Sequence, residues 1–154
     1  MSEGEAISPE EFAQATDTAL GALPGSWTLE PQASSPYARR YRNPKGIRVG
    51  VTYDAHRSHE LDVSLRRQGR DADELALTEV LRATTCPPEE VLRAEYLAPD
   101  APAALHESLQ TVIELLGTWA PGFLAGKRRA YWRAKKLLER DSVGYTEQFE
   151  RDSI

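Results

Sequence analysis

A chain of 154 residues is most simply one domain, 1–154, and it is long enough to bury a core without disulfides. Its hydrophobic share of 40% is ordinary, and no apolar run approaches the roughly 20 residues that cross a bilayer. A net charge of -5 argues against general nucleic-acid affinity, while a lone cysteine and an N-terminus without a secretory signal favour a cytoplasmic location.

The first predicted element is an amphipathic helix over residues 9–22. Ser8 can cap this helix, Pro9 suits its first position, and Glu11 completes a capping box. Pro24-Gly25 ends it. Five apolar side chains recur at helical spacing and predict the buried face: Phe12, Ala15, Ala19, Leu20 and Leu23.

The next part of the chain predicts an antiparallel sheet. Short strands are expected over 26–32 and 37–42, and residues 75–77 can add a brief edge strand. The clearest pattern is a hairpin over 47–65, in which apolar and polar residues alternate on both sides of a polar loop. Pairing Val51 with Val63 aligns its two strands, so we expect a meander of four or five strands with one buried and one polar face.

Helices are expected to follow the sheet and to pack on one of its faces. Thr78 is the expected cap of a short helix, and Asp100 that of the longest helix, which Pro121-Gly122 ends or kinks. The fold class is therefore α+β. The predicted helices span 78–83, 88–92, about 100–120 and 127–140, and the ends 1–7 and 141–154 are expected to be flexible.

The polar face of the sheet is the predicted partner-binding site. The expected register places Arg48 near Arg66 and Thr52 near Asp62, and the preceding strand adds Arg40 and Arg42. Arginine is favoured at interfaces because its planar fork pairs with carboxylates, so this face would dock an acidic partner. The alternative is an ordinary solvated sheet face. The predicted contact residues are Arg40, Arg42, Arg48, Asp62 and Arg66.

A second candidate is the hairpin loop, which could hold a metal or carry out acid–base chemistry. Its candidate ligands are His56 and His59, with Asp54 and Glu60 beside them. The alternative is a solvated turn, because a loop tip excludes little water. We therefore predict no cofactor, no catalytic residue and no assigned metal ligand, and keep a small metal-binding protein or enzyme as the second hypothesis.

A third candidate is the basic last helix, where Arg129, Arg133, Lys136 and Arg140 share a face with Trp132 beside them. Such a face can contact phosphates while the indole stacks on a base. The alternative is a solvated charged face, and the negative net charge ranks nucleic-acid binding last.

Three runs carry a resemblance to a family. They are Val49-x-Val51-x-Tyr53-Asp54, Glu60-Leu61-x-Val63-x-Leu65 and Leu77-Thr78-Glu79-Val80-Leu81-Arg82. Over residues 37–125 the chain is similar to small uncharacterised bacterial α+β proteins, some of which resemble immunity proteins encoded beside polymorphic toxins. This resemblance implies a protein that binds and blocks one toxin and supplies no catalytic residues.

The function expected from the sequence is a non-enzymatic cytoplasmic binding protein of the immunity, inhibitor or adaptor type. Glycine-rich phosphate loops and the common hydrolase and metal motifs are missing, which lowers the expectation of an enzyme. Its expected partner is a protein. A basic toxin would be attracted by the acidic loops, which include Asp71, Asp73 and Glu74. The oligomeric state stays open.

Overall fold

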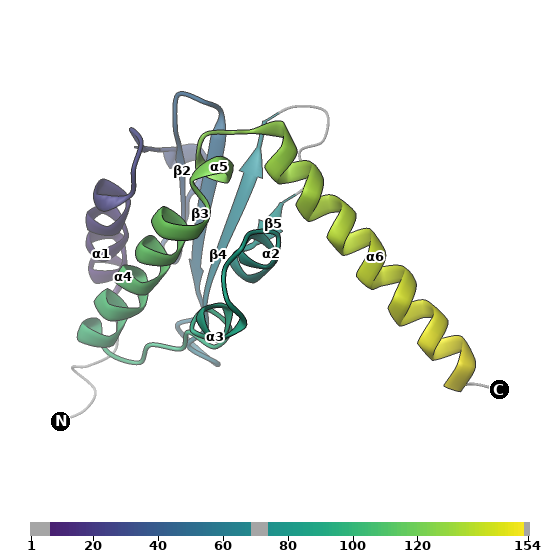
Figure 1. Cartoon of the computed structure of the whole chain (residues 1–154). Helices are drawn as coiled ribbons and strands as arrows, with labels where there is room; N and C mark the ends of the chain where they lie inside the picture. Colours follow the sequence, from purple (N-terminus) through teal and green to yellow (C-terminus); the bar gives the residue numbers. More distant parts are fainter. Residues whose placement is uncertain (1–6, 69–73, 153–154) are drawn as a thin grey trace.

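The computed structural model describes residues 7–68 and 74–152, with backbone alone for 142–152. It confirms the predicted α+β fold, in which a helix precedes a five-stranded sheet and further helices follow it (Figure 1). Residues 1–6 and 153–154 of the expected flexible ends lie outside the described residues. In chain order the elements are α1 (Pro9–Ala22), β1 (Thr28–Leu29), η2 (Pro31–Ala33), β2 (Ala38–Arg42), β3 (Ile47–Tyr53), β4 (Leu61–Arg67), β5 (Leu75–Ala76), α2 (Leu77–Arg82), α3 (Pro88–Leu92), α4 (Pro102–Trp119), α5 (Pro121–Leu124) and α6 (Arg128–Asp152).

Helix α1 has the predicted bounds and the predicted cap. The Glu11 N–H donates to Ser8 Oγ at 3.1 Å, and the Ser8 N–H donates back to Glu11 Oε1 at 3.1 Å. This reciprocal pair satisfies two N–H groups that the first turn of a helix leaves without partners. All five residues of the predicted apolar face are buried, and Phe12 is fully so.

The sheet is an antiparallel meander in the order β1-β2-β3-β4-β5. Its central hairpin has the predicted register, with Val51 opposite Val63 and Gly50 opposite Ser64. The odd-numbered residues of β3 and β4 from Ile47 to Leu65 are buried, so their side of the sheet faces the core. The even-numbered residues then point to the opposite side, which we call the open face.

Helices α1 and α4 lie together on the core side of the sheet (Figure 1). Phe12 of α1 stacks on Tyr53 of β3 with ring centroids 6.0 Å apart, and Leu105 and Leu116 of α4 are fully buried. Burying each such side chain contributes about 1.5–3 kcal/mol relative to leaving it in water. The predicted packing of helices on one sheet face is thereby confirmed for α4.

Two predicted helix caps are wrong. Helix α2 begins at Leu77 rather than Thr78, and the Glu79 carboxylate accepts the Ala76 N–H at 2.7 Å in place of a hydroxyl cap. In helix α4 the N-cap position is occupied by Ala101 rather than Asp100, and no side chain caps the helix there. The reason is Pro102, which suits the first helical position and holds the residue before it in an extended conformation.

The C-terminal part of the chain is more helical than the sequence indicated. Phe123-Leu124, expected in an apolar link, belongs to the short helix α5. Helix α6 continues to Asp152 instead of ending near Arg140, so it is the longest helix, and its second half extends away from the sheet and helices (Figure 1). No proline interrupts residues 141–152, and adding residues to an existing helix costs little.

None of the described helices is both long enough and apolar enough to cross a membrane.

Candidate docking surface

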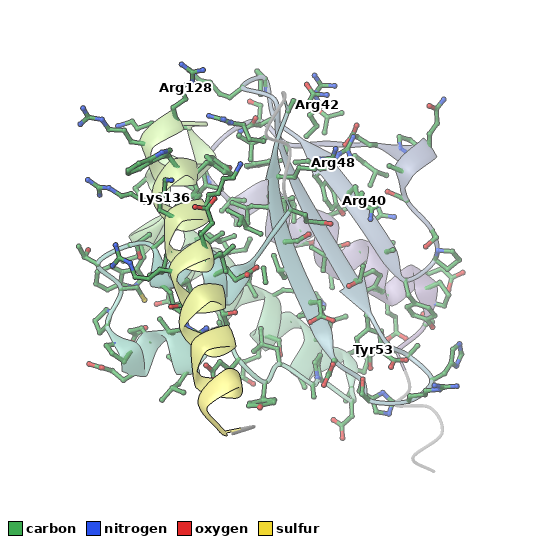
Figure 2. All side chains as sticks on the ribbon, turned by 90° about the vertical axis from the view of Figure 1, so that its right-hand side faces the viewer. Arg40, Arg42, Arg48, Tyr53, Arg128 and Lys136 are labelled. Carbon is green, nitrogen blue, oxygen red and sulfur yellow. The ribbon has the colours of Figure 1, made fainter. Side chains whose placement is uncertain are left out.

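The register aligns polar side chains in rows across the open face. One row holds Arg42, Arg48 and Arg66, which lie directly opposite one another on β2, β3 and β4. Figure 2 shows Arg40, Arg42 and Arg48 on this face, and α6 runs beside the sheet rather than across it. No described helix crosses the arginines in this view: Arg42 and Arg66 are exposed, whereas Arg40 and Arg48 are partly buried.

We call Arg42, Arg48 and Arg66 the arginine row. Neighbouring strands lie about 4.8 Å apart, so the three Cα atoms span about 10 Å. Like charges directly opposite one another across strands are destabilising. A row of three guanidinium groups therefore reduces the stability of the sheet.

The three arginines differ in how they are held. Arg48 is half-buried and donates to both Glu30 carboxylate oxygens, from Nε at 2.6 Å and from Nη2 at 3.2 Å. Arg42 Nη2 donates to Gln68 Oε1. Arg66 is exposed, and its side chain forms no ion pair with any residue in the described ranges. Arg48 is thus held by a carboxylate, Arg42 is exposed with one hydrogen bond to Gln68, and Arg66 extends into solvent.

Glu30 is the residue that makes this arrangement possible. The hydrogen bonds from Arg48 hold the pKa of the Glu30 carboxyl below its usual range, while partial burial opposes the shift. Positive charge from Arg42 and Arg40 lowers this pKa further. A single ionised carboxylate therefore offsets part of the repulsion within the arginine row.

A second row crosses the centre of the open face, where Arg40 lies opposite Gly50 and Gly50 opposite Ser64. Arg40 Nη1 donates to the Ala33 carbonyl at 3.2 Å, and Ser64 Oγ donates to Glu74 Oε1 at 2.6 Å. A Cβ atom on Gly50 would lie 3.0 Å from Ser64 Oγ. The glycine thus leaves space for a compact polar network at the centre of the face.

Not all predicted contact residues gather at one place. Arg42, Arg48 and Arg66 form one row, and Arg40 lies in the next. Asp62 lies opposite Thr52, at the other end of the face from the arginine row. The predicted set is therefore a surface with a basic end and an acidic end rather than a single cluster.

Three contributors to this face were missed from the sequence: Glu30, Gln68 and Glu74. Glu30 lies between β1 and η2, where the alternation of polar and apolar residues is too short to place a side chain. Gln68 and Glu74 flank the segment 69–73, which lies outside the described residues. Gly50 was placed opposite Ser64 by the predicted register, and a glycine inside a strand often marks a close approach of other groups.

The hairpin loop is held together by its own hydrogen bonds. The Asp54 carboxylate accepts from the Ser58 N–H and hydroxyl, and these bonds lower the pKa of Asp54. Tyr53 donates its hydroxyl to the Pro99 carbonyl at 2.7 Å, so the contact of 3.1 Å with His59 Nδ1 requires His59 to donate. His56 instead lies edge-on to Tyr37. Within the described ranges, no three His, Cys, Asp or Glu side chains are grouped closely enough to hold a metal ion.

The basic face of α6 lies away from the arginine row. Trp132 is 60% exposed, and Lys136 Nζ lies 5.7 Å from the centre of its ring. Arg133 and Arg140 border a shallow hollow beside Trp132. The helix thus brings together the residues predicted for phosphate contacts, on a surface separate from the open sheet face (Figure 2).

The comparisons with known proteins give no family. No protein-family model, curated protein or solved structure matches this chain, so the resemblance to immunity proteins stays a prediction.

Proposed function

We propose that this chain is a non-enzymatic binding protein of the inhibitor, immunity or adaptor type, which docks a protein partner through the open face of its sheet. The observation that carries the proposal is the arginine row on an uncovered sheet face. Three like charges in register reduce the stability of the sheet, and a partner carboxylate would relieve that repulsion on binding.

The chemistry of the row favours a partner surface that presents carboxylates. Arg48 is held by both oxygens of Glu30, so it has less side-chain entropy to lose when it meets a partner. Arg66 is exposed and can reach outward to form a bidentate pair. A basic toxin would instead have to approach through Asp62 and the acidic loops, away from the row.

The test is affinity capture with the tagged chain from its native host, together with identification of the neighbouring genes. We compare the parent chain with an Arg42→Glu/Arg66→Glu variant. Both positions are exposed, so the variant should fold. The captured partner is then purified, and its affinity for both chains is measured by calorimetry. Loss of charge pairs at an interface should raise Kd by about 30-fold or more.

The control is Arg57→Glu, which changes an exposed arginine of the hairpin loop outside the open face. This variant should bind as tightly as the parent chain. If the parent and the Arg42→Glu/Arg66→Glu variant capture the same partner equally well, the open face is not the docking surface. Recovery of no stable protein partner would count against the binding function itself.

A further inference from the structure

Helix α6 is divided by charge into two halves of similar length. The first half, 128–140, has six basic residues and one acidic residue, whereas the second half, 141–152, has four acidic residues and one basic residue. At 1.5 Å per residue the halves are about 20 Å and 18 Å long. The basic residues are Arg128, Arg129, Arg133, Lys135, Lys136 and Arg140, and the acidic residues are Asp141, Glu147, Glu150 and Asp152.

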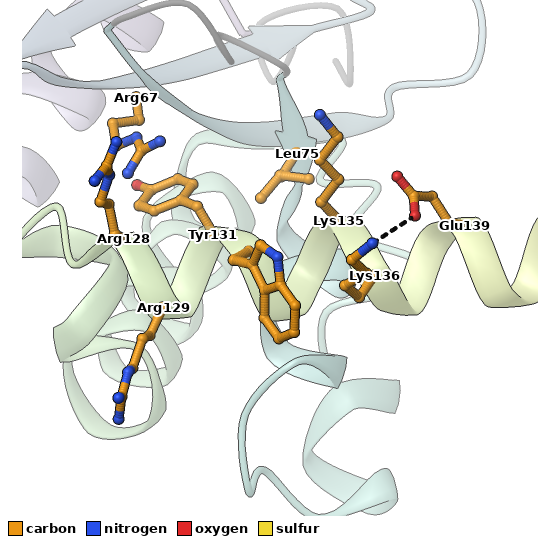
Figure 3. A pocket seen from close by; sticks show the side chains of 9 residues that line it. Arg67, Leu75, Arg128, Arg129, Tyr131, Lys135, Lys136 and Glu139 are labelled. Atoms are coloured by element: carbon orange, nitrogen blue, oxygen red, sulfur yellow. Dashed lines mark hydrogen bonds and ion pairs between the residues drawn. The ribbon is translucent and has the colours of Figure 1, made fainter.

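The first half of α6 borders a groove against the end of the sheet (Figure 3). The groove has a volume of about 510 Å³. Its aromatic part is formed by Tyr131, over which Arg67 lies at 5.4 Å, and by the exposed Trp132. Glu139 is the one acidic side chain among the described residues that line it, and it lies 3.5 Å from Lys136. Five of the nine described residues that line it are basic: Arg67, Arg128, Arg129, Lys135 and Lys136.

The charge of this groove favours an acidic occupant, and the exposed indole of Trp132 favours one that also has apolar side chains. The second half of α6 has that composition, because Val143, Tyr145 and Phe149 stand among its acidic residues. It cannot reach the groove of its own chain. Helix α6 is continuous, and its second half extends away from the sheet and helices (Figure 1).

We propose that two copies of this chain associate through antiparallel α6 helices, so that the acidic half of each lies along the basic groove of the other. With a twofold axis near residue 140, the basic half of one α6 lies beside the acidic half of the other. The two halves have similar lengths and opposite charges. One operation forms the same contact twice, as in the isologous interface of a symmetric dimer. The dimer contact involves α6 and the groove beside it, and leaves the arginine row on the open face available.

The test measures the mass of the full chain in solution by sedimentation equilibrium. The parent chain should be dimeric at low salt. Raising the salt should increase the dissociation constant of the dimer, because opposed exposed charges are screened. Two reversed variants should each be monomeric where the parent is dimeric. These are Arg133→Glu/Lys136→Glu in the basic half and Glu147→Lys/Glu150→Lys in the acidic half.

The decisive step is to mix the two reversed variants in equal amounts. In the mixed dimer, the reversed half of one variant faces the reversed half of the other, and the two unchanged halves face each other. Both contacts then join opposite charges, so the mixture should recover a dimer. Lys45→Glu/Arg57→Glu carries the same charge change as Arg133→Glu/Lys136→Glu but lies outside α6, so it should dimerise like the parent. Circular dichroism should show equal helix content in every variant.

Three results would overturn the proposal. They are a parent chain that stays monomeric at the highest concentration reached at low salt, a dimer that persists in both reversed variants, or a mixture that stays monomeric.

Discussion

At the scale of single residues, the pair formed by Glu30 and Arg48 links the stability of the fold to pH. The folded-state pKa of Glu30 is lowered, chiefly by its hydrogen bonds from Arg48. The pair therefore stabilises the fold above the unfolded-state pKa of glutamate, and that contribution is lost as pH falls through the lower folded-state pKa. We expect Glu30→Gln to reduce the free energy of unfolding by about 0.5–1 kcal/mol at pH 7.

Urea denaturation at neutral and acid pH measures this effect. The difference between the parent and Glu30→Gln should shrink as pH falls through the range in which Glu30 is protonated. Glu107→Gln, which removes an exposed carboxylate from α4, should follow the parent at every pH. Parallel curves for the parent and Glu30→Gln across the acid range would show that the pair contributes nothing to the pH dependence.

The sequence located most of the residues on the open face but not the bonds between them. Period-2 alternation placed Arg42, Arg48 and Arg66 on one side of the sheet, because successive side chains of a strand point to opposite faces. It could not show that Arg48 pairs with Glu30, since the two are 18 residues apart and Glu30 follows a two-residue strand. Long-range pairs between side chains depend on how segments pack, which a local pattern does not contain.

At the scale of elements, the central hairpin was predictable and the ends of the helices were less so. The register of β3 and β4 follows from the apolar set alone, because a shift by one residue would expose every buried side chain. The expected strand over 26–32 shortens to Thr28–Leu29 because Pro31 starts a 3-10 helix. Helix α6 extends past its predicted end because residues 141–152 contain no proline, and the single glycine at 144 is tolerated within a helix that is already formed.

Strand β3 provides a test of how tightly the open face is packed at its centre. A Cβ atom on Gly50 would lie 3.0 Å from Ser64 Oγ and 3.8 Å from Arg40 Nε. The branched side chain of Gly50→Val should displace Ser64 and break its hydrogen bond to Glu74. We expect a loss of about 1–3 kcal/mol in the free energy of unfolding, as for other overpacked sites.

Thr52→Val is the matched control, because Thr52 is an exposed residue on the same strand and the same face. Its effect should stay within about 0.5 kcal/mol. Urea unfolding of both variants makes the comparison. Equal stability of Gly50→Val and the parent would show that the centre of the open face has room for a side chain.

At the scale of the whole molecule, the two proposed binding surfaces are carried by different parts of the fold. The arginine row lies on the sheet, whereas the basic groove lies between the sheet and α6. Helix α5 leads into α6, so the position of α6 relative to the sheet depends on how α5 is attached to the sheet. Tyr131 contributes by donating its hydroxyl to the Phe123 carbonyl at 2.8 Å, but this contact is local to α5 and α6.

Asn43 provides a long-range attachment through hydrogen bonds, in addition to Arg67, which lies over the Tyr131 ring. Asn43 is buried in the turn between β2 and β3, and its Nδ2 donates to the Leu124 carbonyl of α5 at 2.9 Å. Its Oδ1 accepts the N–H groups of Lys45 and Ile47 at 3.0 and 2.9 Å. One side chain thus joins the sheet to the segment that leads into α6.

We expect Asn43→Ala to lower the free energy of unfolding by about 2–3 kcal/mol, because it leaves buried polar groups without partners. Asn43→Asp keeps an oxygen for the two N–H groups but loses the donor to Leu124, and it adds a charge that the site must accommodate. Amide exchange near Leu124 should therefore accelerate in both variants, whereas exchange at Lys45 and Ile47 should accelerate more in the alanine variant. Unchanged exchange near Leu124 in both would mean that α5 is held to the sheet by its apolar contacts alone.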